Sequence, residues 1–223
     1  MENTSLGDRM KRYEGVTDTA LVRRCPVIGR VDGKAFHTLT KGLSKPWDAG
    51  FVQAMQLTAQ HLAGSIQGCV LAYVYSDEIS LLLTDYEQIN TDAWFGYRLQ
   101  KMCSIASAEA SVFFSQQFGR KGLFDARFFN LPENDVVNYF VWRQQDCVRN
   151  SVSSLAQSLY SHQDLLGKDS ASQHDMMMAK GTNWNFVPTH LKRGSTVVGG
   201  QLNLEPPTFT ANREYITSLL PVV

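Results

Sequence analysis

The sequence predicts an α+β fold, in which a ferredoxin-like βαββαβ domain carries a helical C-terminal extension. Segments typical of strands and helices follow one another in the order strand, helix, strand, strand, helix, strand. Two apolar runs, residues 69–75 and 79–83, are separated only by Ser76-Asp77-Glu78, which predicts an antiparallel hairpin with acids at its bend. The 223 residues are 43% hydrophobic, which suffices for one good-sized core.

The first half of the predicted domain follows a polar N-terminal arm. Residues 26–31 are an apolar run that predicts the first strand, and the Asp32-Gly33 step closes it. Glycine, serine and proline predict a loop over residues 41–48. Asp48 then stands where a helix N-cap belongs, and apolar residues recur at helical spacing over 51–66.

The second half repeats the alternation after the hairpin. Residues 91–118 carry an apolar side at helical spacing and predict one long helix. Residues 124–131 predict the next strand, bounded by Gly122 and Pro132. In this topology the first strand and the hairpin lie side by side, as in the palm of many nucleotidyl polymerases and cyclases.

The rest of the chain predicts a mostly helical addition. Residues 134–160 contain no proline and predict one or two helices, and residues 172–180 predict a shorter one. Residues 197–198 predict a late edge strand. We therefore expect a palm-like catalytic domain over 1–135, including the N-terminal arm, and a helical extension over 136–223 packed on it as one compact unit.

Composition narrows the cellular setting. The 21 Lys and Arg residues balance 21 Asp and Glu, so no global field draws the chain to nucleic acid or membrane. The four cysteines form no C-x-x-C pair, which predicts neither a zinc site nor a disulfide framework. The polar N-terminus lacks the apolar stretch of a signal peptide, and no segment approaches a membrane span of about 20 apolar residues. We expect a cytoplasmic protein without membrane contact.

Two acidic stretches carry the chemical prediction. Asp32 ends the first predicted strand, and Asp77-Glu78 interrupts the hairpin. Taken alone, each is as typical of a turn as of a ligand, but together they place carboxylates at neighbouring strand ends. Close carboxylates repel unless a cation intervenes, and Mg²⁺ prefers such oxygen ligands. The bare backbone at Gly33 offers a further carbonyl ligand.

Other residues nearby suggest phosphate contacts. The amides of Lys34, Ala35, Phe36 and His37 can cradle a triphosphate as a backbone nest. The side chain of Phe36 is equally typical of a core residue, and that of His37 of a structural histidine. Lys45 is placed to reach a phosphate.

Charged residues on the predicted helices are harder to interpret. Arg98 and Lys101 are three apart and therefore share a helix face, which can grip phosphates or simply be solvated. Arg143, Asp146 and Arg149 repeat this spacing on the next helix. For these charges we expect ordinary solvated faces.

Taken in order, several segments resemble one known family. They are residues 5–11 (SLGDRMK), 30–37 (RVDGKAFH), 45–48 (KPWD), 75–80 (YSDEIS), 124–127 (FDAR), 142–147 (WRQQDC), 180–185 (KGTNWN) and 192–194 (KRG). Their order and spacing are similar to those of the tRNA-histidine guanylyltransferase family, and within it of the Thg-like tRNA-repair proteins. The match runs across most of the chain.

The resemblance implies a set of site residues. Asp32, Asp77 and Glu78 would be catalytic, with two Mg²⁺ ions held by Asp32, Gly33 and Asp77. The residues placed along the nucleotide are Arg30, Gly33, Lys34, Ala35, Phe36, His37, Lys45, Asp48, Ser76, Arg98 and Lys101. The implied substrates are nucleoside triphosphates (GTP and ATP) and the 5′ end and acceptor stem of tRNA, and the implied assembly is a homotetramer.

The implied reaction is 3′-to-5′ nucleotide addition. The RNA 5′ end is first activated, by adenylation of a monophosphate or through an existing triphosphate. The 3′-hydroxyl of an incoming nucleoside triphosphate then attacks the 5′ α-phosphate, and AMP or pyrophosphate leaves.

One departure from the family pattern bears on the substrate. Enzymes specialised for tRNA-histidine carry His-Ile-Asn-Asn where this chain has Val148-Arg149-Asn150-Ser151. The Arg-Asn-Ser segment resembles the Thg-like branch, which favours template-directed repair of 5′-truncated tRNA. Addition of a single guanosine to tRNA-histidine, nucleotide cyclisation, and RNA binding without catalysis are the alternatives.

Overall fold

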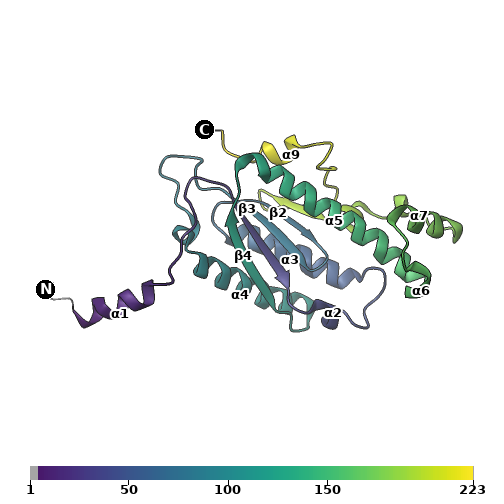
Figure 1. Cartoon of the computed structure of the whole chain (residues 1–223), viewed down its shortest axis with the longest axis horizontal. Helices are drawn as coiled ribbons and strands as arrows, with labels where there is room; N and C mark the ends of the chain where they lie inside the picture. The colour runs from purple at the N-terminus through teal and green to yellow at the C-terminus, as the bar shows by residue number, and fades with distance from the viewer. Residues whose placement is uncertain (1–4, 223) are drawn as a thin grey trace.

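The computed structural model describes residues 5–222 and is built around one antiparallel sheet. The strand order is β4-β1-β3-β2-β5-β6 (Figure 1). The strands are β1 (Val27–Gly33), β2 (Cys69–Tyr75), β3 (Glu78–Leu83), β4 (Phe124–Asn130), β5 (Ser195–Val198) and β6 (Gln201–Asn203). The long helices are α3 (Ala49–Ser65), α4 (Leu99–Phe118) and α5 (Glu133–Leu159).

Helices cover both faces of the sheet. α3 and α4 pack on one face over a core that includes Phe36, Phe51 and Phe114 (Figure 1). α5 crosses the other face over a second core that includes Ile28 and Leu82. The two central strands β1 and β3 are therefore buried on both sides, which explains their nearly continuous apolar sequences.

Shorter helices complete the chain. They are α1 (Leu6–Gly15), α2 (Phe36–Leu39), α6 (His162–Leu165), α7 (Ser170–Ala179), α8 (Thr189–Arg193), α9 (Glu214–Thr217) and the 3₁₀ helices η1 (Trp94–Tyr97) and η2 (Trp184–Phe186). α1 projects from the body at the N-terminal end and buries none of its residues (Figure 1). No helix in the described part of the chain combines the length and apolar character that a membrane crossing requires.

The predicted fold class is confirmed, and the predicted α+β order is present as β1-α3-β2-β3-α4-β4. Asp48 caps α3 as expected, because its Oδ1 accepts a hydrogen bond of 3.0 Å from the amide of Phe51. The 134–160 segment forms the single helix α5. The extension also contributes β5 and β6 to the same sheet.

Two predicted boundaries were wrong. The helix expected over 91–118 begins only at Leu99, because Phe95 and Gly96 have φ values of 52° and 58°, which break the helical path. The late strand is not at the edge of the sheet, because β6 pairs outside β5. The spacing of apolar residues predicted the long helix and the late strand. It carries no information about the left-handed backbone at Phe95 and Gly96, or about a further strand that pairs outside β5.

Gly29 marks the closest approach within the sheet. It lies opposite Phe128 in the β1–β4 pair, and a Cβ at Gly29 would be 2.4 Å from that ring. We expect Gly29→Ala to lower the free energy of unfolding by about 1–3 kcal/mol through overpacking.

The matched control is Gly64→Ala on α3, where a Cβ meets nothing within 4 Å. That change should raise the free energy of unfolding by about 0.5–1 kcal/mol through helix propensity. Urea denaturation of both variants checks the pair. An equal effect of the two substitutions would contradict the close packing at Gly29.

Candidate active site

Cross-strand register gathers charged residues on the face that α5 covers only in part. Asp32 lies opposite Glu78 of β3 on one side and opposite Asp125 of β4 on the other. Two residues earlier in β1, Arg30 lies opposite Arg127. Because side chains alternate along a strand, these five share one face. They form an acidic row at the strand ends and a basic row beside it.

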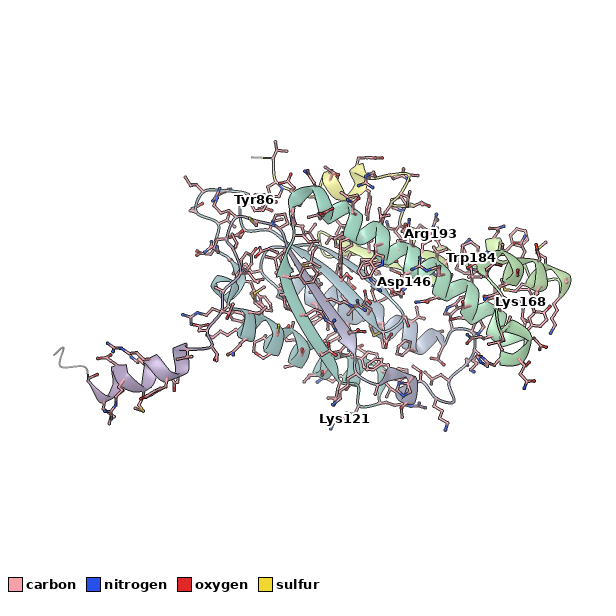
Figure 2. All side chains as sticks on the ribbon, viewed as in Figure 1. Tyr86, Lys121, Asp146, Lys168, Trp184 and Arg193 are labelled. Atoms are coloured by element: carbon pink, nitrogen blue, oxygen red, sulfur yellow. The ribbon has the colours of Figure 1, made fainter. Side chains whose placement is uncertain are left out.

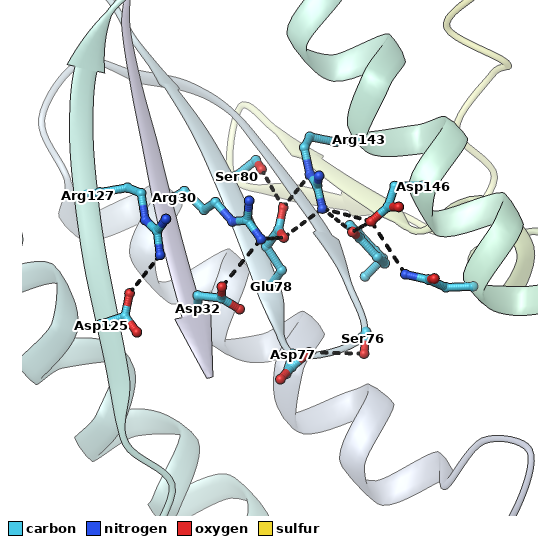
Figure 3. Close-up of polar contacts among 12 residues, drawn as sticks. Arg30, Asp32, Ser76, Asp77, Glu78, Ser80, Asp125, Arg127, Arg143 and Asp146 are labelled. Atoms are coloured by element: carbon cyan, nitrogen blue, oxygen red, sulfur yellow. Dashed lines mark hydrogen bonds and ion pairs between the residues drawn. The ribbon is translucent and has the colours of Figure 1, made fainter. Parts of the chain in front are cut away.

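Glu78 is held by two arginines from different elements. Arg30 Nη2 lies 2.5 Å from Glu78 Oε2 and 3.3 Å from Asp32 Oδ2, so it bridges the two carboxylates. Arg143 of α5 donates from Nε to Glu78 Oε1 at 2.7 Å and from Nη2 to Oε2 at 2.8 Å (Figure 3). This bidentate pair is nearly dry, with the Arg143 and Glu78 side chains 4% and 5% exposed.

The same network continues along α5. Arg143 Nη2 also donates to the hydroxyl of Tyr75 and, at 3.1 Å, to Asp146 Oδ2. The Tyr75 hydroxyl donates to that same Asp146 oxygen at 2.6 Å. Burial acts to raise the pKa of Asp146, but the hydrogen bond from Tyr75 and the arginine charges outweigh it and lower the pKa. The hairpin is thus fastened to α5 on both of its strands.

Asp77 lies at the tip of this hairpin. Tyr75 and Glu78 are cross-strand partners, so Ser76 and Asp77 alone form the turn, with Ser76 at φ 50°. The carbonyl of Asp77 accepts a hydrogen bond of 2.9 Å from the amide of Gly33, which ties the turn to the end of β1. Asp32 and Asp77, although far apart in the sequence, therefore lie at neighbouring positions of the folded sheet, at one edge of the site (Figure 3).

The acid pair is electrostatically unfavourable by itself. Burial raises the pKa of Asp77, and the charge of Asp32 adds to that rise. The backbone amide of Asp77 and the Ser76 hydroxyl, which donates to Oδ1 at 3.1 Å, act in the opposite direction but do not cancel it. A buried carboxylate whose pKa is raised by burial and by a neighbouring carboxylate favours a bound cation.

The donor set fits magnesium bound together with a substrate. No cluster of three or more His, Cys, Asp or Glu side chains suited to a metal occurs within residues 5–222. Glu78 is engaged by Arg30 and Arg143, and Asp125 pairs with Arg127 at 3.2 Å. Asp77, and Asp32 with only a 3.3 Å contact to Arg30, are the more available carboxylates. Mg²⁺ is typically held by one or two carboxylates plus phosphate oxygens, so this set matches a magnesium–nucleotide site.

The backbone after β1 is only partly available for phosphates. The amide of Lys34 donates to the carbonyl of Leu123 at 2.7 Å, so it is already used. The amides of Ala35, Phe36 and His37 have no acceptor within the described range, and Ala35 has a left-handed conformation with φ 57°. The predicted cradle therefore reduces to three amides.

The side chains in that segment differ in availability. The Phe36 ring is buried with its centroid 4.9 Å from that of Phe124 and 5.2 Å from that of Phe114. It is a core residue and reaches the site only through its backbone. Lys34 and His37 are exposed.

A pocket opens beside the hairpin tip. Its volume is about 270 Å³, and it lies between the loop before α3, the hairpin, α5 and α8. Lys45, Asp48 and Ser76 line it, together with Asn150 and Ser151 of α5. Ser76 is shared with the acid turn, so the pocket and the carboxylates form one continuous site.

Two predicted residues are not brought to this site within the chain. Arg98 is the residue before α4 and pairs with Asp18 at 3.4 Å, and Lys101 lies 5.9 Å from the Phe95 ring. The α4 N-terminus follows the end of β3 that pairs with the start of β1, whereas Asp32 is near the end of β1. Their nucleotide role remains a prediction.

The expectation for Arg143 and Asp146 was wrong, because neither belongs to a solvated face. Arg143 is buried in the network, and Asp146 is half-buried in it. A signal was present in the sequence, because Val136, Phe140, Arg143 and Cys147 share a helical spacing and their apolar members predict burial. A charge at such a position needs a buried partner.

The comparisons with known proteins agree with this geometry. A family model described as tRNAHis guanylyltransferase matches residues 7–132. The tRNA(His) guanylyltransferase of Schizosaccharomyces pombe is 27% identical over 208 residues, which cover 83% of this chain and 77% of that protein. The uncharacterized protein R259 of Acanthamoeba polyphaga mimivirus is 28% identical, covering 86% and 76%.

Solved structures give the same answer. A bacterial tRNA(His) guanylyltransferase (Thg1)-like protein in complex with ATP superimposes with a TM-score of 0.94 at 39% identity, covering 98% of this chain and 100% of that one. Such a protein in complex with GTP gives a TM-score of 0.87 at 36% identity, covering 96% and 98%.

With these similarities, the sheet that carries a row of carboxylates beside a pocket is that of a nucleotidyltransferase. The family-model match extends over more than half of the chain. The protein belongs to the tRNAHis guanylyltransferase (Thg1) family. The resemblance predicted from the sequence segments is confirmed.

The buried ion pair gives a first prediction for the site. We expect Arg143→Met to lower the free energy of unfolding by about 3–5 kcal/mol, because the change removes one partner of a buried carboxylate. Arg149→Met is the matched control, since Arg149 also pairs with the network but its side chain is 55% exposed. The control should cost less than about 1 kcal/mol.

Urea denaturation measures both variants. Adding Glu78→Gln to Arg143→Met should recover part of the loss, because it removes a buried charge that has lost one of its two arginine partners. Equal costs for Arg143→Met and Arg149→Met, or no recovery in the double variant, would contradict a buried charge pair.

The acid pair gives a second prediction. A carboxyl with a raised folded pKa stabilises the fold most at low pH, and this contribution is lost as pH rises through the folded pKa. At neutral pH in EDTA, Asp77→Asn should therefore raise the Tm, by about 2–4 °C if the gain is near 1 kcal/mol. Asp92→Asn, on an exposed loop, should leave the Tm unchanged. A lower Tm for Asp77→Asn in EDTA would show that the ionised pair is not strained.

Proposed function

We propose that this protein is a template-dependent 3′-to-5′ nucleotidyltransferase that adds nucleotides to the 5′ end of truncated tRNA. The substrates would be nucleoside triphosphates with two Mg²⁺ ions. The observation that carries the proposal is that Asp32 and Asp77 lie at neighbouring strand ends, where the amide of Gly33 donates a hydrogen bond to the Asp77 carbonyl. Family membership supports the tRNA substrate.

The arrangement of pocket and acids supports nucleotide binding. ATP and GTP occur in the complexes of the similar bacterial proteins. In this chain a nucleotide in the pocket would lie against Lys45 and Ser76, and its phosphates would extend toward the acid pair and the free amides of Ala35 to His37. An exposed lysine and amide donors both favour phosphate oxygens.

The chain's residues have separate roles in the proposed reaction. The 3′-hydroxyl oxygen of the incoming nucleotide forms a bond to the 5′ α-phosphorus of the RNA, and the bond from that phosphorus to AMP or pyrophosphate breaks. The leaving group departs with the bonding electrons, and the hydroxyl proton passes to solvent water. Magnesium, when bound, lowers the proton affinity of the hydroxyl and neutralises charge on the phosphates. Asp32 and Asp77, with the Gly33 carbonyl, would hold it. Glu78 would contact neither the magnesium nor the nucleotide. It would act as a positioning residue, because it pairs with Arg30, which in turn contacts Asp32.

Template direction is proposed from the α5 segment Val148-Arg149-Asn150-Ser151. Asn150 and Ser151 line the nucleotide pocket, whereas Val148 lies outside it. The histidine of the tRNA-histidine-specific pattern is thus replaced at a position that does not line this pocket. Watson–Crick pairing with the acceptor strand would then select the nucleotide.

A second candidate is addition of one guanosine to tRNA-histidine, which the names of the curated relatives favour. Extension of tRNA-histidine compared with other 5′-shortened tRNAs separates the two. Strict dependence on the histidine anticodon would support the second candidate.

We extend the proposal to a homotetramer. α1 is an amphipathic segment that buries none of its residues, and it exposes Leu6, Met10 and Tyr13 at helical spacing. Such a helix is suited to pack against another copy of the chain.

The activity is tested with a 5′-shortened, 5′-triphosphorylated tRNA, the four nucleoside triphosphates and Mg²⁺. The wild type should lengthen the 5′ end, and Asp32→Ala and Asp77→Ala should each reduce the rate at least about 100-fold by removing charge at the reacting phosphates. Asp92→Ala, on an exposed loop at the other end of the sheet, is the control.

No growth at the 5′ end with the wild type would rule out the proposed polymerase. Wild-type rates in Asp32→Ala or Asp77→Ala would rule out the metal assignment. RNA binding without Mg²⁺ dependence or nucleotide incorporation would indicate a non-enzymatic tRNA-binding protein.

A further inference from the structure

A second cavity lies on α5, away from the nucleotide pocket. Its volume is about 480 Å³, and it is open to solvent. The residues that line it are Gln144, Gln145, Val148, Arg149, Trp184, Arg193, Thr208 and Thr210. We call this the α5 groove. It shares no lining residue with the nucleotide pocket.

The charge of the α5 groove is one-sided. Its lining contains two arginines, Arg149 and Arg193, and no carboxylate, although Asp146, just outside the lining, pairs with Arg149. Lys192, the neighbour of Arg193 in the chain, has its Nζ 5.1 Å from the centre of the Trp184 ring. Burial, and after it the charge of Arg193, lowers the pKa of Lys192, and Glu205 only partly offsets this. In a chain with no net charge, such a local excess favours an anionic partner.

Arg193 has unused hydrogen-bonding capacity. Its Nη1 donates to Thr208 Oγ1 at 2.6 Å, but its Nε is buried without a partner among residues 5–222. The side-chain amide of Gln144 donates a hydrogen bond to the carbonyl of Pro207 and accepts one from the amide of Phe209. These two hydrogen bonds hold the segment around Thr208 against α5. The groove is therefore a built surface in which one arginine donor lacks an acceptor.

The α5 groove is coupled to the acid turn through Asp146. Arg149 Nη2 donates a hydrogen bond to Asp146 Oδ1 at 2.9 Å, whereas Asp146 Oδ2 accepts hydrogen bonds from Arg143 and from the Tyr75 hydroxyl. Asp146 thus links Arg149, in the lining of the groove, to Tyr75 of the hairpin that carries Asp77. Figure 2 shows Asp146, Trp184 and Arg193 gathered along the middle of α5.

We propose that the α5 groove binds the sugar-phosphate backbone of the RNA whose 5′ end lies at the acid pair, with Arg149 and Arg193 contacting phosphates. This inference rests on the proposed function and names the RNA-binding surface of that same site. Arginine forks and neutral side-chain donors are the usual partners of phosphate oxygens. Gln145 and Thr210 supply neutral donors beside the two arginines. Segments 180–185 and 192–194, which have no role in the nucleotide pocket, then form the wall of the RNA surface.

The test measures RNA binding by fluorescence anisotropy. The probe is a 3′-labelled tRNA transcript that lacks its first nucleotide, titrated with the full chain at several salt concentrations. The variants are Arg149→Gln, Arg193→Gln and the double substitution. Lys168→Gln, an equal loss of charge between α6 and α7, is the matched control (Figure 2). Arg193→Lys retains the charge but loses the fork.

Each single glutamine variant should weaken RNA binding about five- to tenfold and reduce the slope of log Kd against log salt by about one. The double variant should lose the product of the two effects. Lys168→Gln should bind as the wild type does, and Arg193→Lys should bind between the wild type and Arg193→Gln. ATP affinity should stay within error of the wild type, because neither arginine lines the nucleotide pocket.

Wild-type RNA affinity and salt slope in the double variant would overturn the proposal. An equal loss with Lys168→Gln, or a loss of ATP affinity with RNA affinity unchanged, would also overturn it, since the groove would then be non-specific or a free-nucleotide site. If the wild type binds RNA through the groove but lengthens no 5′ end, the proposed activity falls and the groove assignment stands. If the wild type lengthens 5′ ends while the double variant binds RNA normally, the groove assignment falls and the proposed activity stands.

Discussion

The buried carboxylate of Glu78 sets the geometry on which the site depends. A charge at that depth is stable only with close partners, and here the partners are Arg30 from β1 and Arg143 from α5. The pair to Arg30 also fixes Asp32, and the pair to Arg143 fastens the hairpin that ends in Asp77. The two ion pairs of Glu78 therefore connect the end of β1 and the hairpin, which carry the acid pair, to α5.

The charge distribution explains how a neutral chain can handle a polyanion. Carboxylates collect in one row at the strand ends, arginines occupy the next row, and further cations line the α5 groove. The acid pair is held at a cost, because the fold brings Asp32 and Asp77 together while burial opposes the charge of Asp77. Such a site gives up some stability without ligand in return for a cation site that is already assembled.

Local patterns predicted much of this and missed what depends on distant contacts. The hairpin with Ser76 and Asp77 at its bend could be predicted because two apolar runs flank a short polar segment. The start of the long helix was not, since the break at Phe95 is a backbone conformation that apolar spacing does not encode. The partner of Arg143 was also unpredictable, because Glu78 lies 65 residues away and only the folded sheet brings them together.

Anomalous diffraction from crystals grown with Mn²⁺ and a non-hydrolysable ATP analogue tests the central claim most directly. Manganese takes oxygen ligands as magnesium does and can be located by its own scattering. The account predicts an anomalous peak in contact with the carboxylates of both Asp32 and Asp77, on the side of the nucleotide phosphates. A fully occupied metal that touches neither carboxylate, or an Asp77 side chain turned away from Asp32, would contradict it.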